Sequence, residues 1–211
     1  MPSPEPSRER ADKHELILDA AIRVFAEKGF HAARIADVAD AAGVADGTIY
    51  LYFKNKDDLL LSIFEEKMDL LTAGLHDALA GAQDPLDKVR RFAHYHFRQV
   101  RDHRALAEVL QIELRLSNKF LKEYRPEKLW EYLGIFASIV RDGQECGSIR
   151  KDVDAFMASW AFFGAMDEMA MQFVLSRHGK FSLDAAAETV AGIFIRGLAA
   201  PASPSTIQEP A

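Results

Sequence analysis

The stretch IADVADAAGVADGTIYLYFKNKDDLL, residues 35–60, decides the fold of this chain. Its first part has helical periodicity and ends at Gly43, and a second short helical segment follows after a turn of about four residues. The pattern predicts helices over residues 35–42 and 46–52. Two short helices around a glycine-containing turn form a helix-turn-helix, whose second helix enters the major groove of DNA.

Helical periodicity continues on both sides of this motif, and neither strand-like alternation nor an internal repeat interrupts it. Asn55 is expected to cap the next helix, with Asp58 completing an approximate capping box, and Asp84 is expected to cap the helix that opens with Pro85. The further helices are predicted over residues 13–28, 56–79, 85–103, 105–116, 127–144, 153–175 and 183–198. The sequence therefore predicts an all-α fold of about nine helices.

The predicted helices divide the chain into four segments. Residues 1–12 form a flexible N-terminus, and residues 13–56 form the helix-turn-helix DNA-binding domain. Residues 57–199 form a helical domain for ligand binding and dimerisation, and residues 200–211 form a disordered tail.

Charge and composition limit the possible functions. The formal net charge of -6 argues against extended phosphate contacts, so DNA affinity must come from a few well-placed cations and helix N-termini. The single cysteine, Cys146, forms no intrachain disulfide and offers no metal-ligand spacing. Neither a membrane-spanning run nor a signal peptide is expected, which indicates a cytoplasmic protein.

Three blocks of residues resemble the TetR family of transcriptional repressors. They are residues 29–32, residues 35–44 and residues 47–60, and the sequence GTIYLYFKNK at the start of the third block is the most specific. The resemblance implies an all-helical homodimer. Its N-terminal helix-turn-helix would bind palindromic operator DNA, and its C-terminal part would bind a small lipophilic effector that releases the DNA.

The resemblance also implies which residues contact DNA. In the family, the positions of Thr48, Tyr50 and Tyr52 lie on or near the groove-facing surface, while Gly47 lets the backbone approach phosphate. Lys56 corresponds to the family's phosphate-clamping lysine. Hydroxyl and phenol groups donate to phosphate oxygens without adding net charge. The alternative for the two tyrosines is a role as core aromatics.

The sequence departs from the family pattern in two places, at residues 33–34 and at residue 46. Many members carry Thr or Ser at the positions of Ala33 and Arg34, where it caps the second helix and binds phosphate. Ala33 cannot cap, so Arg34 is expected to supply the phosphate contact. Asp46 is expected to be the N-cap of the recognition helix, because an outward carboxylate would repel the DNA backbone.

Three motifs are similar to the FadR-type branch of the family, which represses fatty acid degradation and releases DNA on binding long-chain acyl-CoA. They are VADGTIYLYFKNK at residues 44–56, ELRLSN at residues 113–118 and GAMDE at residues 164–168. This resemblance implies an acyl-CoA effector, no cofactor, no metal and no enzymatic activity.

The C-terminal helices are apolar enough for both a ligand and a partner subunit. The segment 153–175 is apolar nearly all round, so it must be covered on both sides, and with 183–198 it predicts a four-helix isologous dimer interface. The residues expected at that interface are Phe162, Met166, Phe173, Ala187, Ala191, Phe194 and Ile195. The residues expected to bind ligand are Phe64, Met68, Leu71, Phe92, His96, Arg98, Leu110, Leu114, Arg115, Leu133, Trp160, Gly164, Asp167 and Met171.

The coenzyme A phosphates would need cations, and the predicted helix 85–103 has a basic face. The candidate cations are Arg90, Arg91, Arg98 and Arg101 on that face, with Arg104, Arg115 and Lys119 nearby. The alternative is a solvated charged face with no ligand.

Three other classes of protein remain as alternatives. An enzyme would use His96 with Asp167 or Glu168, but the sequence has no nucleophile motif or glycine-rich phosphate loop. An efflux-type repressor would bind a lipophilic cation or aromatic drug through residues such as Trp160 and Met171. A purely structural helical dimer would leave the helix-turn-helix unexplained.

Overall fold

The computed structural model describes residues 6–116, 124–176 and 181–201. Every regular element in these ranges is a helix, and the one isolated bridge pairs Ile149 with Ala199. The elements are α1 Pro6–Lys28, α2 Ile35–Ala42, α3 Asp46–Ile49, α4 Lys56–Leu79, α5 Pro85–Asp102, α6 Arg104–Glu108, the π-helix η1 Val109–Glu113, α7 Leu114–Leu116, α9 Glu127–Cys146, α10 Ala155–Leu175 and α11 Leu183–Leu198. The all-α prediction is confirmed.

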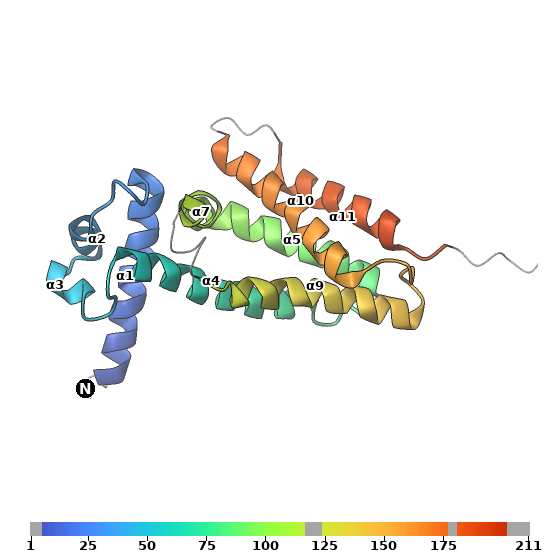
Figure 1. Cartoon of the computed structure of the whole chain (residues 1–211), viewed down its shortest axis with the longest axis horizontal. Coiled ribbons are helices and arrows are strands. Elements are labelled where there is room, and N and C mark those ends of the chain that lie inside the picture. Colours follow the sequence, from blue (N-terminus) through green and yellow to red (C-terminus); the bar gives the residue numbers. More distant parts are fainter. Residues whose placement is uncertain (1–5, 117–123, 177–180, 202–211) are drawn as a thin grey trace, which may run out of the picture.

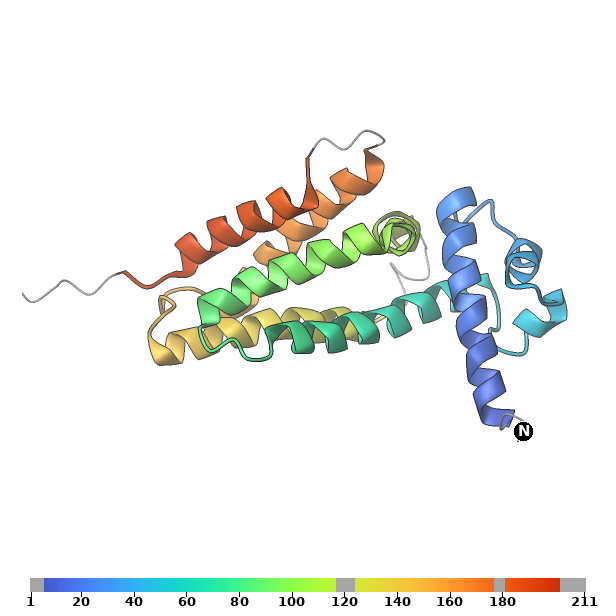
Figure 2. The same cartoon turned by 180° about the vertical axis from the view of Figure 1, so that it is seen from behind.

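The molecule has a head at one end and a longer helical body. Helices α1, α2 and α3 form the head, and α4 runs from the head into the body (Figure 1). In the body, α11 packs mainly on α5, while α9 packs on α10 and α4 (Figure 2). Helix α4 therefore belongs to both parts, because its first turns contact α1 and its later turns contact α5 and α9.

Side-chain caps set the starts of the long helices. The carboxamide of Asn55 accepts a hydrogen bond from the backbone N–H of Asp58, and the Asp84 carboxylate accepts one from Leu86 N–H. Both predicted caps are confirmed. The predicted cap at Asp46 is wrong, because Ala45 holds the N-cap position and Asp46 is the first residue of α3. The Asp46 carboxylate still lies in the first turn, where the helix dipole favours a negative charge.

Several helices differ from their predicted ranges, and α3 is among them because it ends at Ile49 rather than at residue 52. Helix α1 begins at Pro6, so residues 6–12 are helical rather than flexible, while residues 1–5 and most of the predicted tail lie outside the described residues. The predicted helix 105–116 is divided into α6, η1 and α7. A π-helical turn widens the backbone by one residue, and such turns occur frequently at functional sites.

The faces of α10 and α11 differ from their predicted roles. Phe162, Met166, Ala187 and Ala191 are at most 1% exposed, so they lie in the protomer's own core and not on an outer face as predicted. The Phe162 ring stacks on Phe136 with 4.1 Å between centroids. The other residues predicted at the interface, Phe173, Phe194 and Ile195, are partly buried against this core. Because α10 is apolar nearly all round, hydrophobicity alone did not indicate which side faces inward.

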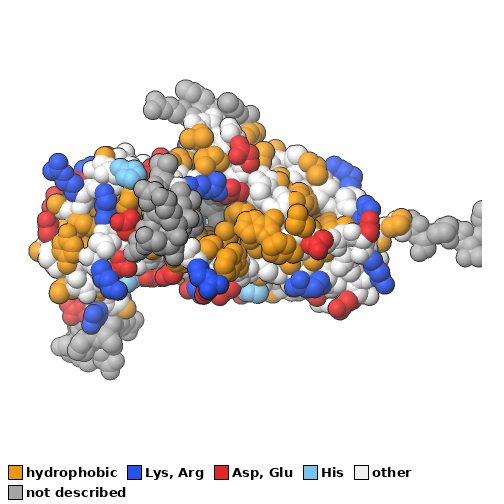
Figure 3. All heavy atoms as spheres, viewed as in Figure 1, with side chains coloured by type: hydrophobic (Ala, Val, Ile, Leu, Met, Phe, Trp, Pro, Cys, Tyr) orange, Lys and Arg blue, Asp and Glu red, His pale blue; other side chains and the backbone are white. Residues whose placement is uncertain are grey.

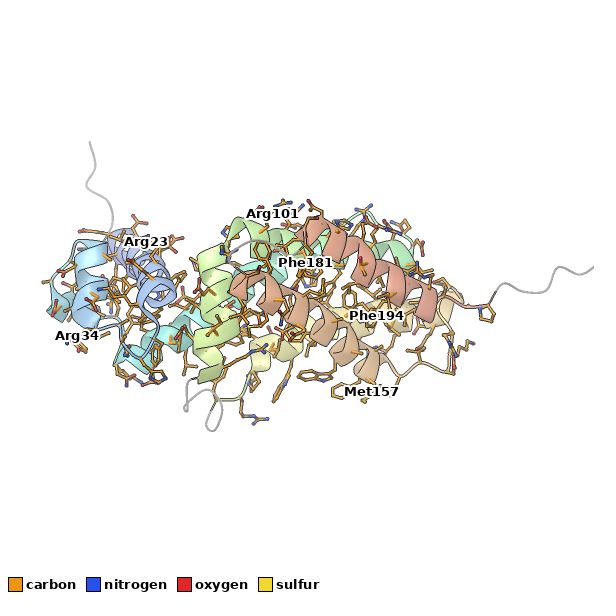
Figure 4. The ribbon with its side chains drawn as sticks, turned by 90° about the horizontal axis from the view of Figure 1, so that it is seen from above. Arg23, Arg34, Arg101, Met157, Phe181 and Phe194 are labelled. Atoms are coloured by element: carbon orange, nitrogen blue, oxygen red, sulfur yellow. The ribbon has the colours of Figure 1, made fainter. Side chains whose placement is uncertain are left out.

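The outer side of these helices is apolar as well. Phe156, Met157 and Trp160 on α10 are 64%, 65% and 38% exposed, and Ile193 on α11 is 57% exposed. Hydrophobic side chains gather over α10 in the space-filling view (Figure 3). Figure 4 shows Met157 on the outer side of α10, whereas Phe194 lies between α10 and α11.

Candidate functional site

The end of the head that lies away from the body carries the predicted DNA contacts. Gly47 is exposed and Thr48 half-buried on α3, and Tyr50 directly after it is 57% exposed. Leu51 is 72% exposed, whereas Phe53 is buried. The phenol of Tyr50 is therefore free to meet a phosphate or a base edge, and the methyl groups of Leu51 are available beside it.

Arg34 precedes α2 and is exposed at the outer side of the head (Figure 4). Its backbone N–H donates to the Asp37 carboxylate at 2.7 Å, and the guanidinium makes no side-chain cap. Lys28 Nζ donates to the same carboxylate at 2.8 Å. The hydrogen bond from Lys28, followed by the one from Arg34, holds the pKa of Asp37 below its usual value. This acid is thus paired, which reduces its repulsion of a DNA backbone.

Tyr52 and Lys56 are more enclosed than Tyr50. Tyr52 is half-buried, its ring lies 5.9 Å from the His14 ring, and the Arg10 guanidinium lies 5.8 Å from its centroid. Lys56 Nζ donates to the carbonyl oxygens of Phe30, His31 and Ala33 at 2.6, 3.3 and 2.9 Å. The Lys56 ammonium therefore holds the α1–α2 loop, and a phosphate would have to compete with three carbonyls for it.

An apolar cavity of about 150 Å³ lies in the body between α4, α5, the α6–α7 segment, α9 and α10. The predicted ligand residues that line it are Phe64, Met68, Leu71, His96, Leu110, Leu114, Arg115 and Asp167. Residues that were not predicted also line it, and they are Gln99, Val100, His103, Leu106, Ala107, Gln111, Leu129, Tyr132 and Phe163. Of these, Gln111 could have been identified from the sequence, because it is a glutamine within an apolar helical segment.

Six residues predicted to bind ligand do not line this cavity. Phe92 and Leu133 are buried in the core beside it, and Met171 is partly buried. Trp160 and Gly164 lie on the exposed side of α10. Arg98 is exposed and places its guanidinium 5.5 Å from the Tyr95 ring centroid. The predictions for the α10 residues Trp160, Gly164 and Met171 were wrong because the opposite face of this helix packs inward.

Two polar atoms of residues that line the cavity are buried without a hydrogen-bond partner among the described residues. They are His96 Nε2 and Gln111 Oε1. The other ring nitrogen of His96, Nδ1, lies 3.2 Å from the Tyr132 hydroxyl. Burial lowers the pKa of His96 to about 4, and Asp167 opposes part of this shift. The imidazole is therefore neutral near pH 7.

An ion pair forms the remaining polar part of the cavity wall. Arg115 donates to the Asp167 carboxylate, whose side chain is 14% exposed, while that of Arg115 is 46% exposed. Arg115 is the one Lys or Arg among the described residues that line the cavity. It lies at the boundary between the apolar interior and solvent.

The basic face of α5 is largely neutralised by acids. Arg90 and His94 both bind the Glu188 carboxylate of α11, at 2.6 and 2.8 Å. Arg101 binds Asp184 of α11 at 3.0 Å, and Figure 4 shows its place beside that helix. Arg91 pairs with Asp87 within α5. Arg90 and Arg101 thus join α5 to α11, and Arg90, Arg91 and Arg101 do not line the cavity. Lys119 lies outside the described residues.

A direct contact joins the wall of the cavity to the head. The side chain of Glu113, in η1, accepts a hydrogen bond from the backbone N–H of Phe30 at 2.7 Å. Leu110 and Gln111 in the same π-helix line the cavity, as do Leu114 and Arg115 directly after it. The loop that Glu113 contacts is also the loop that Lys56 holds.

The described residues include neither a helix able to cross a membrane nor a group of three or more His, Cys, Asp and Glu side chains placed to hold a metal ion.

Comparison with known proteins covers both parts of the chain. Residues 17–63 match the family model of bacterial regulatory proteins of the tetR family, and residues 64–197 match that of the C-terminal region of YsiA-like proteins. The chain is 35% identical to the fatty acid metabolism regulator protein of Bacillus subtilis over 191 residues, which cover 90% of this chain and 98% of that one.

Two solved structures of FadR proteins are also similar to this chain. The fatty acid degradation regulator FadR from Bacillus halodurans superposes with a TM-score of 0.82 and 36% identity, covering 93% of this chain and 98% of that chain. The FadR of Bacillus subtilis in complex with stearoyl-CoA superposes with a TM-score of 0.81 and 36% identity, covering 87% and 98%.

Proposed function

The chain belongs to the TetR family of bacterial regulatory proteins, and on this premise we propose that it represses fatty acid degradation genes and leaves its operator when long-chain acyl-CoA binds. One observation carries the proposal. The π-helix that lines an apolar cavity also contacts the head through Glu113. A ligand in the cavity and DNA on the head therefore act on one structural element.

The proposed DNA surface consists of the exposed residues around α3. Gly47, Thr48 and Tyr50 face the groove, and Arg34 supplies a phosphate contact at the start of α2. Tyr52 contributes from the edge of this surface. Lys56 acts by positioning the loop before α2, because its ammonium binds that loop's carbonyls.

The cavity suits an acyl chain in chemistry but requires widening. Burial of methylene groups contributes about 0.8 kcal/mol each, so a chain of about sixteen carbons supplies on the order of 10 kcal/mol before entropic costs. Sites for drug-sized ligands measure roughly 300–1,000 Å³, whereas this cavity measures about 150 Å³. An open polar groove of about 410 Å³ adjoins it and shares Leu71, Gln99, His103 and Leu106 as lining residues. Rotation of these side chains provides the extra room.

Widening of the cavity supplies the mechanism of release. Leu110 and Gln111 must move outward when a chain enters, and Glu113 in the same π-helix carries that movement to Phe30. A hundredfold loss of operator affinity requires only about 2.7 kcal/mol of differential ligand binding.

The proposed repressor is a dimer that pairs through the exposed faces of α10 and α11. The exposed apolar residues Met157, Trp160 and Ile193 lie on these faces. An isologous four-helix contact would cover them and set the two recognition helices about 34 Å apart, one turn of DNA. We expect Ile193→Asp to yield monomers by sedimentation and to lose operator binding. A dimer that persists with full affinity would contradict this interface.

A lipophilic cation is the rival effector. The cavity's carboxylate, Asp167, is already bound by Arg115, so it offers no free negative charge to a cation. The long-chain thioester remains the better match.

Operator binding tests the function. Fluorescence anisotropy on the promoter fragment upstream of the gene, at fixed salt, is measured with and without palmitoyl-CoA. We expect palmitoyl-CoA to release the DNA, while free coenzyme A and free palmitate leave it bound. Binding that no thioester disturbs would refute the proposed effector, and absence of DNA binding would refute the repressor.

A further inference from the structure

The cavity contains two polar groups that the apolar part of a ligand does not explain. His96 Nε2 and Gln111 Oε1 are both buried without a described partner, and Gln111 is only 8% exposed. An unsatisfied buried polar atom destabilises the folded state, so such atoms call for an explanation in a native structure. Both residues line the cavity, His96 from α5 and Gln111 from η1.

The proton of His96 can be placed from its neighbours. Burial raises the pKa of the Tyr132 phenol, so this group keeps its proton and acts as a donor. The Tyr132 hydroxyl lies 3.2 Å from His96 Nδ1, to which it can donate. A neutral imidazole that accepts a hydrogen bond at Nδ1 carries its own proton at Nε2. His96 thus offers an N–H donor to the cavity.

Gln111 can offer a second donor. The two ends of a carboxamide occupy nearly the same space, and a half-turn of the terminal torsion exchanges the oxygen for the NH₂ group. Neither the neutral imidazole nor the amide carries a charge. The one cation among the described lining residues, Arg115, already pairs with Asp167, so a carboxylate would be buried here without a free counter-charge. The group that fits is an uncharged oxygen acceptor.

We propose that His96 and Gln111 bind the thioester carbonyl oxygen of the acyl-CoA effector and so determine where the acyl chain begins in the cavity. This inference rests on the proposed function, to which it adds the position of the ligand along the cavity. Arg115 lies on the cavity wall with its side chain 46% exposed. This position is expected at the junction between the buried acyl chain and the polar coenzyme A. The same geometry selects a thioester over a free fatty acid, whose carboxylate would be buried beside two uncharged groups with no free cation among the described lining residues.

A pair of ligands that differ only at the carbonyl tests the proposal. Palmitoyl-CoA has the carbonyl, and S-hexadecyl-CoA replaces it with a methylene group. Titration calorimetry on the full-length protein is expected to show about tenfold tighter binding of the thioester, the value of one or two buried hydrogen bonds. His96→Phe and Gln111→Leu should each reduce this ratio, while binding of the thioether is retained or improved.

A matched control lies on the same helix. His94 is two residues from His96, on the outer face of α5, where it binds Glu188. The His94→Phe variant should keep the wild-type ratio. Retained thioether binding in each variant shows that the cavity is intact, and Gln111→Leu provides the test if His96→Phe does not fold.

The outcomes separate the two proposals. Equal binding of thioester and thioether by the wild type, or a tenfold ratio that survives both substitutions, overturns the carbonyl site and leaves the acyl-CoA repressor standing. Failure of both ligands to bind overturns the proposed effector itself, and the carbonyl site with it.

Discussion

Removal of the contact between Glu113 and the head should uncouple ligand from DNA. The Glu113 carboxylate accepts the Phe30 N–H at 2.7 Å in a partly buried position. Hydrogen bonds to charged groups contribute about 1.5–3 kcal/mol, and a hundredfold release by ligand corresponds to about 2.7 kcal/mol. One contact of this size can account for most of the coupling. We therefore expect Glu113→Ala to reduce the release by palmitoyl-CoA from about a hundredfold to less than about tenfold.

The assay compares operator affinity with and without saturating palmitoyl-CoA, by anisotropy at fixed salt. Palmitoyl-CoA affinity is measured separately without DNA, so that loss of coupling is distinguished from loss of binding. Glu108→Ala, in α6 of the same segment, removes the same charge and leaves the Phe30 contact in place. If Glu113→Ala binds palmitoyl-CoA normally and still shows the full hundredfold release, the proposed path through η1 is wrong.

Three further predictions concern stability. Gly74→Ala places a Cβ in steric overlap with the Tyr95 hydroxyl and should destabilise the fold by about 1–3 kcal/mol in urea unfolding, with Tyr95→Phe in the same chain restoring part of the loss. Lys56→Met removes hydrogen bonds to three loop carbonyls and should increase hydrogen exchange in the head. Burial lowers the pKa of His96 to about 4 from its ordinary value of 6.5, so between these values the unfolded chain binds a proton that the folded protein does not. The free energy of unfolding should therefore decrease as the pH is lowered through this window, by up to about 3 kcal/mol. His96→Phe should flatten that part of the profile.

Local signals in the sequence predicted much of the fold. Helices α2 and α11 occupy their predicted ranges, and the caps at Asn55 and Asp84 form as expected. These features depend on residues that are close in sequence, such as a glycine in the left-handed region at Gly43 with φ of 67°.

Features that depend on distant partners were harder to predict. The orientation of α10 was reversed, because apolar residues on all sides give no preferred face and packing against Phe136 decides it. The basic face of α5 looked available for phosphates, but the acids that neutralise it are about a hundred residues away on α11. The break of the helix after Glu108 into a π-turn had no sequence signal that we can identify.

Lys56 belongs to α4, yet its ammonium donates hydrogen bonds to carbonyl oxygens of the loop that precedes α2. A shift of the first turn of α4 must therefore carry α2 along, and α3 with it, since α2 and α3 pack together. The head then tilts as one piece, and the arrangement of its base-contacting side chains is preserved. It follows that the effector alters how tightly the protein holds DNA and not which bases it prefers, so a selection of random operator sequences should return the same consensus with and without effector.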